Sequence, residues 1–257
     1  MRLTKMILKA AVPVPRVENY RRYLFVGPHP DDIEIGAGAT AAKLAAMSKE
    51  VCFLVCLDGR FGEGNAPEGV RGDALAALRK EEAIRSAKVL GVTDVRFLDL
   101  CDGGFYEQKD LVHGIARVVG DFQPDVILGP DPDVTSECHI DHRNVGNAIR
   151  QVACFAPYGG IMAGYGAKAA PVQALAYFMT AKPNRFVKTN GYLSQQHEAI
   201  FGCHLSQFPE GSADGNAIAL YLKIRALDFG IRSGKGKAEG FRVLGVTHMH
   251  CLPEAGN

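Results

Sequence analysis

Residues 23–38 read YLFVGPHPDDIEIGAG, a short apolar run followed at once by ionisable side chains. The run at 23–27 has the length and the aromatic and β-branched content of a buried strand. His29, Asp31 and Asp32 come directly after it. Because ligands of open α/β sheets bind beyond the carboxyl ends of the strands, this stretch predicts an α/β fold with a functional site directly after its first strand.

The rest of the chain continues an alternation of strands and helices. Further strands are expected at 51–57, 95–100, 125–130 and 172–180, and helices at 38–48, 73–91, 111–122, 143–156, 190–208 and 214–229. Single helices between strands imply right-handed crossovers and a parallel sheet. We expect a Rossmann-like, doubly wound, mostly parallel sheet in a single domain at 21–257. A lead-in segment at 1–20 precedes it, where Pro13 and Pro15 disfavour regular structure.

A second polar cluster follows the strand expected at 125–130. The loop there reads DPDVTSECHIDHRN and contains His139, Asp141 and His142. The commonest doubly wound strand order, 3-2-1-4, makes the first and fourth strands neighbours. The two clusters, far apart in sequence, are therefore expected to meet in the crevice between these strands.

These residue types suit a hydrolytic metal site. Such a zinc site usually takes three nitrogen or oxygen ligands from the protein and keeps one position for water. His29, Asp32 and His142 form the natural set, close in type to the His/His/Glu sites of zinc hydrolases. Zn²⁺ is the expected ion, and Fe²⁺, Co²⁺ or Mn²⁺ also suits these ligands.

The remaining ionisable residues are candidates for proton transfer. Asp31 stands next to a ligand and is the candidate base that takes a proton from water. His139, when protonated, stabilises an oxyanion and supplies the proton that a leaving amine needs. Asp141 is expected to orient His139 and to raise its pKa.

Two other interpretations of the first cluster remain open at this point. Asp31 and Asp32 could simply cap the helix that follows, as isolated acidic pairs often do. The glycines of IGAGAT resemble part of a dinucleotide fingerprint, although its third glycine is replaced and only Asp58 offers an acid after the second strand. Close packing of a helix on the sheet would explain Gly36 and Gly38 equally well.

Composition narrows the class of function. The chain has 257 residues, with 29 Lys+Arg against 28 Asp+Glu, so no basic patch suggests a nucleic-acid partner. The longest apolar runs have the length of strands, so no membrane span is expected, and Lys9 makes the N-terminus a poor secretory signal. Seven cysteines without a CxxC pair favour reduced thiols and a cytoplasmic location.

The sequence resembles the PIG-L / LmbE-like zinc-dependent de-N-acetylases. The resemblance rests on GPHPDDIEIGAGATAAKL and HIDH and continues in LDGRFGEG, LRKEEAIRSAKVLGV and FLDLCDGGF. It implies an LmbE-like fold and a hydrolase that removes the acetyl group from an N-acetylglucosamine-type sugar or glycoconjugate. It places the family's metal ligands at His29, Asp32 and His142, its base at Asp31, and its histidine–carboxylate pair at His139 and Asp141.

The resemblance determines the substrate and the partners less closely. It implies a small acetamido sugar or glycoside as substrate and a homo-oligomer, either a trimer or a hexamer. An amidase that acts on a non-sugar amide is an alternative, and a nucleotide-binding Rossmann module is a less favoured one.

Several further residues have two interpretations. Arg79 matches an arginine that points into the site in relatives, but a surface ion pair with Glu82 explains it equally well. Arg60 replaces an acid that many relatives carry, in a long Gly-rich loop at 59–69 that is a candidate lid. For His248 and His250, a solvated C-terminus is favoured over a role in the site or at a neighbouring subunit.

Overall fold

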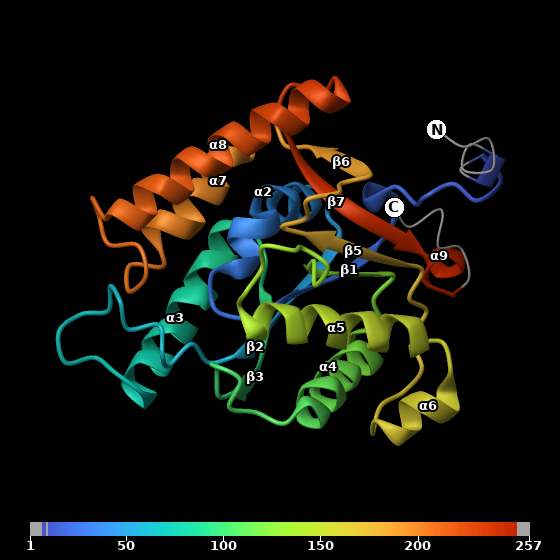
Figure 1. The fold of residues 1–257 in the computed structure, drawn as a ribbon, viewed down its shortest axis with the longest axis horizontal. Helices are drawn as coiled ribbons and strands as arrows, with labels where there is room; N and C mark the ends of the chain where they lie inside the picture. The colour runs from blue at the N-terminus through green and yellow to red at the C-terminus, as the bar shows by residue number, and fades with distance from the viewer. Residues whose placement is uncertain (1–6, 9, 251–257) are drawn as a thin grey trace.

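The computed structural model describes residues 7–8 and 10–250, which form a seven-stranded sheet between two layers of helices (Figure 1). The strands are β1 (Arg22–Gly27), β2 (Glu50–Leu57), β3 (Asp94–Leu100), β4 (Val126–Pro130), β5 (Ala174–Phe178), β6 (Arg185–Lys188) and β7 (Ala238–Gly245). Their order is β3-β2-β1-β4-β5-β7-β6. The first five strands are parallel, and β7 is antiparallel to β5 and β6. The predicted doubly wound, mostly parallel sheet with the order 3-2-1-4 is confirmed.

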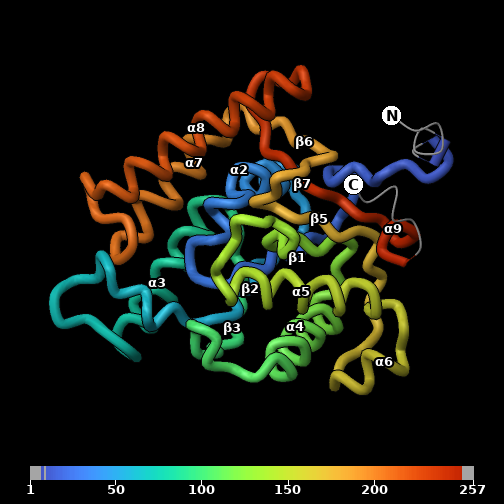
Figure 2. The backbone as a smooth tube through the Cα atoms, viewed as in Figure 1, coloured from blue at the N-terminus to red at the C-terminus, as the bar shows by residue number. Residues whose placement is uncertain are grey.

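The helices cover both faces of this sheet. They are α2 (Asp32–Ala46), α3 (Asp73–Val89), α4 (Gln108–Phe122), α5 (Ile140–Phe155), α6 (Gly159–Gly164), α7 (Leu193–His197), α8 (Ala213–Ser233) and α9 (Val246–His250), with short turns η1 (Val17–Asn19) and η2 (Glu198–Gly202). The backbone trace shows α4, α5 and α6 on one side and α2, α7 and α8 on the other (Figure 2). None of these described helices is both long and apolar enough to cross a membrane.

Several elements differ from the sequence prediction. The helix expected at 190–208 is shorter and consists of α7 and η2. The edge strand β6, its neighbour β7 and the helix α6 were not expected. A strand of four residues such as β6 is too short to show a clear period-two pattern, and a tight six-residue helix with three glycines has a weak helical signal.

Strand β1 is central because both of its faces are apolar. Leu24 and Val26 pack into the core under α4 and α5, whereas Tyr23 and Phe25 pack into the core under α2 and α3. All four side chains are fully buried. The strand therefore lies in the middle of the sheet. The residues that follow its carboxyl end at Gly27 lie between β1 and β4, where the strand order reverses direction.

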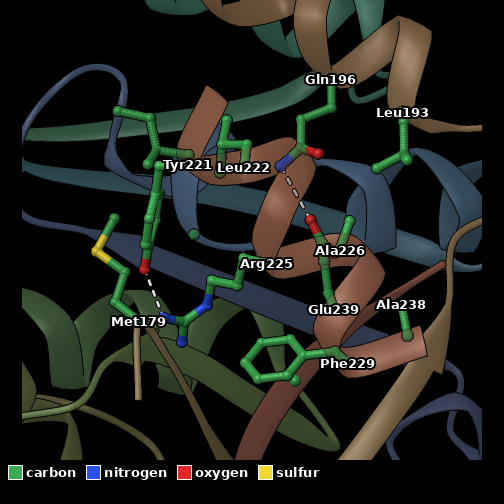
Figure 3. Close-up of a pocket in the computed structure, with 13 residues that line it drawn as sticks. Met179, Leu193, Gln196, Tyr221, Leu222, Arg225, Ala226, Phe229, Ala238 and Glu239 are labelled. Atoms are coloured by element: carbon green, nitrogen blue, oxygen red, sulfur yellow. Dashed lines mark hydrogen bonds between the residues drawn. The ribbon is translucent and has the colours of Figure 1, made fainter. Parts of the chain in front are cut away.

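Helix α2 begins at Asp32, six residues earlier than predicted, and is interrupted at Ala37, where φ is −155°. The interruption frees backbone N–H groups in the middle of the helix. Glu239 of β7 accepts hydrogen bonds from the N–H groups of Ala39 at 3.2 Å and Thr40 at 2.7 Å. Gln196 also donates to this carboxylate at 2.9 Å (Figure 3). The backbone N–H groups that a phosphate near these glycines would need therefore already have a partner in a side chain of the protein.

The glycines of IGAGAT serve close packing. A Cβ at Gly36 would lie 2.3 Å from the ring of Phe178, and a Cβ at Gly38 would lie 3.1 Å from Gln196. Both glycines lie inside α2 rather than in a loop before it. This arrangement removes the basis for the dinucleotide interpretation.

Candidate metal and catalytic site

The structure brings the two predicted clusters together at the carboxyl ends of β1 and β4, which are neighbouring strands. Nδ1 of His29 lies 3.1 Å from Oδ2 of Asp32, and Nε2 of His142 lies 3.4 Å from the same oxygen. These residues offer ligand atoms that all lie within 4.8 Å of one another. The geometry therefore suits a single ion held by His29, Asp32 and His142.

The charges of these three residues depend on one another. Burial by itself would raise the pKa of Asp32, but the neighbouring His142 and His29 hold it well below its usual value. Burial lowers the pKa of His29, and hydrogen bonds to Asp141 and Asp32 outweigh that effect and raise it to about 9. For His142, Asp32 and Glu137 likewise outweigh burial and raise the pKa to about 10. The cluster thus concentrates negative potential where a cation would sit.

Asp141 contacts two histidines of the cluster, and it lies closer to His29. Its carboxylate lies 3.0 Å from Nε2 of His29 and 3.9 Å from Nδ1 of His139. The same carboxylate accepts hydrogen bonds from the N–H groups of Gly103 at 2.7 Å and Gly104 at 2.9 Å. The contact with His29 was not expected, and the orienting role of Asp141 toward His139 stays a prediction.

His139 stands at the edge of the cluster with about half of its side chain exposed. Its Nδ1 accepts the N–H of Asp141 at 3.3 Å and caps α5. In the neutral ring this leaves Nε2 as the nitrogen that carries the proton. Asp141 acts on the pKa of His139 in the predicted direction and raises it, but burial and the nearby His29 and His142 outweigh this effect and lower the pKa overall.

Asp31 lies on the other side of the cluster in a strained backbone conformation, with φ at 121°. The guanidinium of Arg79 holds it there, since one nitrogen donates to Oδ2 of Asp31 at 3.1 Å and to the carbonyl of Pro30 at 2.8 Å. Burial raises the pKa of Asp31 to about 6 although Arg79 acts against this rise. A carboxyl group with a raised pKa next to a metal site is suited to accept a proton.

The interpretation of Arg79 as a surface ion pair with Glu82 is wrong, whereas its role in substrate binding stays a prediction. The side chain is buried rather than on the surface, and it binds Asp31 and backbone carbonyls instead of Glu82. Glu82 accepts its hydrogen bonds from the backbone and hydroxyl of Ser206. Arg79 does border the cleft, but its polar contacts are to the protein.

The cluster opens into a cleft of about 350 Å³. Several residues of its wall were not predicted as site residues: Phe61, Asp102, Gly103, Gln207 and Phe208. Phe61 is half exposed, and its ring makes an edge contact with the exposed ring of Phe105 at 5.6 Å. For three of them the signal was positional, because Phe61 follows β2 and Asp102 and Gly103 follow β3, on the same side of β1 in the strand order. Gln207 and Phe208 lie between η2 and α8, where the position in the sheet gave no signal.

The loop at 59–69 forms part of this wall. Gln207 donates to the carbonyl of Gly62 at 2.8 Å, and Asn65 donates to the carbonyl of Gln207 at 2.8 Å. Arg60 forms ion pairs with Asp58 and Asp73 at 2.6 and 2.9 Å. The charge of Arg60 is therefore used within the protein, and the lid function of the loop stays a prediction.

The C-terminal histidines lie in α9, away from the residues that line the cleft. His248 is buried, and its Nδ1 accepts the N–H of Gly245 at 3.2 Å. His250 lies 3.8 Å from the sulfur of Cys154. The interpretation of a solvated C-terminus is thus wrong for His248. Cys251 lies outside the described residues, and the six described cysteines are free thiols.

The segment that contains this candidate site matches a known protein family. Residues 24–153, which include every predicted ligand and proton-transfer residue, match the family described as PIG-L, GlcNAc-PI de-N-acetylase. The chain belongs to this family. The resemblance indicated by the HPDD and HIDH motifs is confirmed.

Relatives of this PIG-L family member extend the similarity beyond the matched segment. The chain is 33% identical over 258 residues to diacetylchitobiose deacetylase of Thermococcus kodakarensis, which covers 98% of this chain and 93% of the relative. The solved structure of N,N'-diacetylchitobiose deacetylase from Pyrococcus horikoshii matches with a TM-score of 0.86 and 27% identity, over 98% of this chain and 97% of the other.

A second group of relatives matches a shorter part. The 1D-myo-inositol 2-acetamido-2-deoxy-alpha-D-glucopyranoside deacetylase of Kineococcus radiotolerans is 38% identical over 123 residues, which cover 46% of this chain and 34% of that protein.

Proposed function

We propose that this PIG-L family member is a zinc-dependent deacetylase that hydrolyses the acetamido group of an N-acetylglucosamine-type sugar. One observation carries the proposal. Ligand atoms of His29, Asp32 and His142 converge in a cleft that Asp31 and His139 also line. The names of the relatives given above describe deacetylases of acetamido sugars, and this supports the same substrate class for the present chain.

The donor set fits a divalent cation of borderline softness. Two imidazole nitrogens and one carboxylate oxygen form a common three-residue set for catalytic zinc. A bound ion would act as a Lewis acid that polarises the acetyl carbonyl and promotes the ionisation of water. Asp141 supports the set, because it holds Nε2 of His29 and so leaves Nδ1 free to act as the ligand atom.

The chain's own residues would move the protons. Asp31 would accept a proton from the attacking water, whose oxygen adds to the acetyl carbonyl carbon. Nε2–H of His139 would donate to the oxygen that becomes negatively charged. When the C–N bond breaks, Asp31 would pass the proton that it took from the water to the leaving nitrogen, and the products are acetate and a free amino sugar.

The cleft offers both polar and aromatic surfaces to a sugar. Phe61 presents an exposed ring at its edge, and Asp102 and Gln207 are polar groups in its wall. Sites for small molecules commonly combine apolar walls with a few polar groups that fix orientation. This combination supports a saccharide over a simple aliphatic amide as the substrate.

The test measures acetate release from N-acetylglucosamine, diacetylchitobiose and an acetamide without a sugar, with the metal content of each preparation measured in parallel. We expect His142→Ala to lose both metal and activity. Asp31→Asn should keep the metal and lose activity by roughly 100- to 10,000-fold, the usual contribution of a general base.

Asp99→Asn is the matched control, because Asp99 is exposed and forms an ion pair with Lys80 on the surface. Full activity of the wild-type protein after metal removal would refute the metal-dependent mechanism. Faster cleavage of the non-sugar acetamide than of either sugar would refute the proposed substrate class.

A further inference from the structure

Helix α8 is apolar on two opposite faces. Its inner face packs Ala226, Phe229 and Gly230 against the sheet, where they are buried. Its outer face carries a second apolar row, which we call the α8 stripe: Leu220, Ile224, Leu227 and Ile231. These side chains are 59%, 57%, 41% and 81% exposed. A helix that is apolar on both faces is typical of one that is covered on both faces.

The spacing within the stripe is regular. Successive members are four, three and four residues apart, and the exposed Ala217 continues the row by a further three. Tyr221 lies beside the stripe and is 48% exposed. A repeat of four and three over apolar positions is the pattern with which one helix packs along another. Figure 1 shows α8 at the outside of the molecule, with α7 on its inner side and α9 far from it.

We infer that the α8 stripe is the contact between two copies of this chain, with α8 packed along α8 of the second copy. A two-fold contact uses the same patch on both partners, so a straight row of interlocking apolar side chains is complementary to itself. The row from 217 to 231 has its midpoint at Ile224, which places the two-fold axis near this residue.

The size of the patch suits such a contact. If each large side chain offers about 200 Å², the stripe and Tyr221 expose roughly 500 Å² of apolar surface per copy. Burial on both copies would remove about 1,000 Å² from water before any flanking residue is included, which reaches the lower bound for a specific interface. The apolar groove beside the stripe, lined by Leu193, Phe201 and Lys223, would extend the contact.

The charges beside the stripe favour a protein partner over a membrane surface. The exposed charged residues of α8 are two acids, Asp214 and Asp228, and two bases, Lys223 and Arg232. Asp228 and Arg232 also lie 3.4 Å apart as an ion pair. Helices that lie on membranes are rich in Lys and Arg on the polar face. The exposed face of α8 has no excess of Lys and Arg over Asp and Glu. We therefore favour a second copy of the chain, rather than a membrane, as the partner of the α8 stripe.

The test is sedimentation velocity of the full chain over a series of concentrations. We expect the wild-type protein to sediment with an even multiple of the mass of one chain, and Ile224→Glu to halve that mass or reduce it to one chain. Ile84→Glu is the matched control, because Ile84 is 47% exposed on α3 and should leave the mass unchanged. Circular dichroism confirms that each variant is folded.

Cross-linking gives an independent measurement that needs no disruptive charge. In a Cys138→Ser background, which removes an exposed thiol, Ile224→Cys should form a disulfide between two copies on mild oxidation, and Ile84→Cys should not. A wild-type protein with the mass of one chain at every concentration would overturn the inference. So would an assembly that survives Ile224→Glu and fails to cross-link at this position, or a single chain that binds vesicles of anionic phospholipid through the stripe.

Discussion

Replacement of Asp141 by Asn tests how this PIG-L family member holds its metal ligand. The carboxylate is fully buried and accepts from Gly103 and Gly104 while it faces Nε2 of His29. An asparagine offers one acceptor oxygen and one NH₂ group in the same place. Whichever way the amide turns, its buried NH₂ group faces a donor rather than an acceptor, namely the N–H of Gly103 or of Gly104.

The structure gives the size of the effect. One buried donor without a partner costs about 1–3 kcal/mol of folding stability. Loss of the negative charge also weakens the hold on His29, and removal of such a supporting carboxylate typically lowers metal affinity about 10- to 100-fold. We therefore expect Asp141→Asn to be folded, less stable and weaker in metal binding, with lower activity at limiting metal.

Two assays separate these effects. Urea denaturation in the presence of a chelator measures stability without a contribution from bound metal. Competition with a chromophoric chelator then measures the affinity for zinc. Asp99→Asn serves as the control for the same chemical change at an exposed position and should stay within about 0.5 kcal/mol of wild type. An Asp141→Asn protein with wild-type stability and zinc affinity would refute this account of the site.

Two further predictions concern buried charges near α2. Arg79→Met removes the partner of Asp31 and of the carbonyls of Pro30 and Gly59, so we expect the free energy of unfolding in urea to fall by about 3–5 kcal/mol and kcat to fall strongly. Arg79→Lys should restore neither, because one ammonium lacks the planar fork of the guanidinium. A fully active Arg79→Met protein would contradict this prediction. Burial raises the pKa of Glu239 from 4.5 to about 7. Between these two pH values the folded state keeps a proton that the unfolded state has lost. The free energy of unfolding should therefore fall by about 3 kcal/mol at most as the pH rises from 4.5 to 7. Glu239→Gln should flatten that slope in denaturation curves measured from pH 4.5 to 8, and an equally steep slope in both proteins would show that Glu239 does not titrate there.

The sequence was sufficient where the signal is local or follows from topology. The apolar run at 23–27 and the single helices between strands predicted a doubly wound parallel sheet, whose commonest strand order supplied the order of β1 to β4. That order in turn brought HPDD and HIDH to one crevice, since both follow strands that are neighbours in the sheet. The types of the residues then indicated a metal site without any knowledge of distances.

Sequence patterns were weaker at the boundaries of elements. The sequence predicted that the helix begins at Gly38, whereas α2 already begins at Asp32 and is broken at Ala37. Glu239, which satisfies the N–H groups freed by that break, comes from β7, 199 positions away from Thr40. No local pattern reports a partner at such a separation.

What the sequence determined by itself was therefore the order of β1 to β4, the place where the two clusters meet and the chemical types of the candidate ligands. Only the tertiary structure decided which buried polar group serves which partner: Asp141 lies closer to His29 than to His139, and Arg79 holds Asp31 rather than Glu82. The physical reason is that periodicity records only which side of an element is apolar. Packing decides the partner of a buried charge, because a buried polar group must be hydrogen-bonded and its partner can only be a group that the fold places next to it.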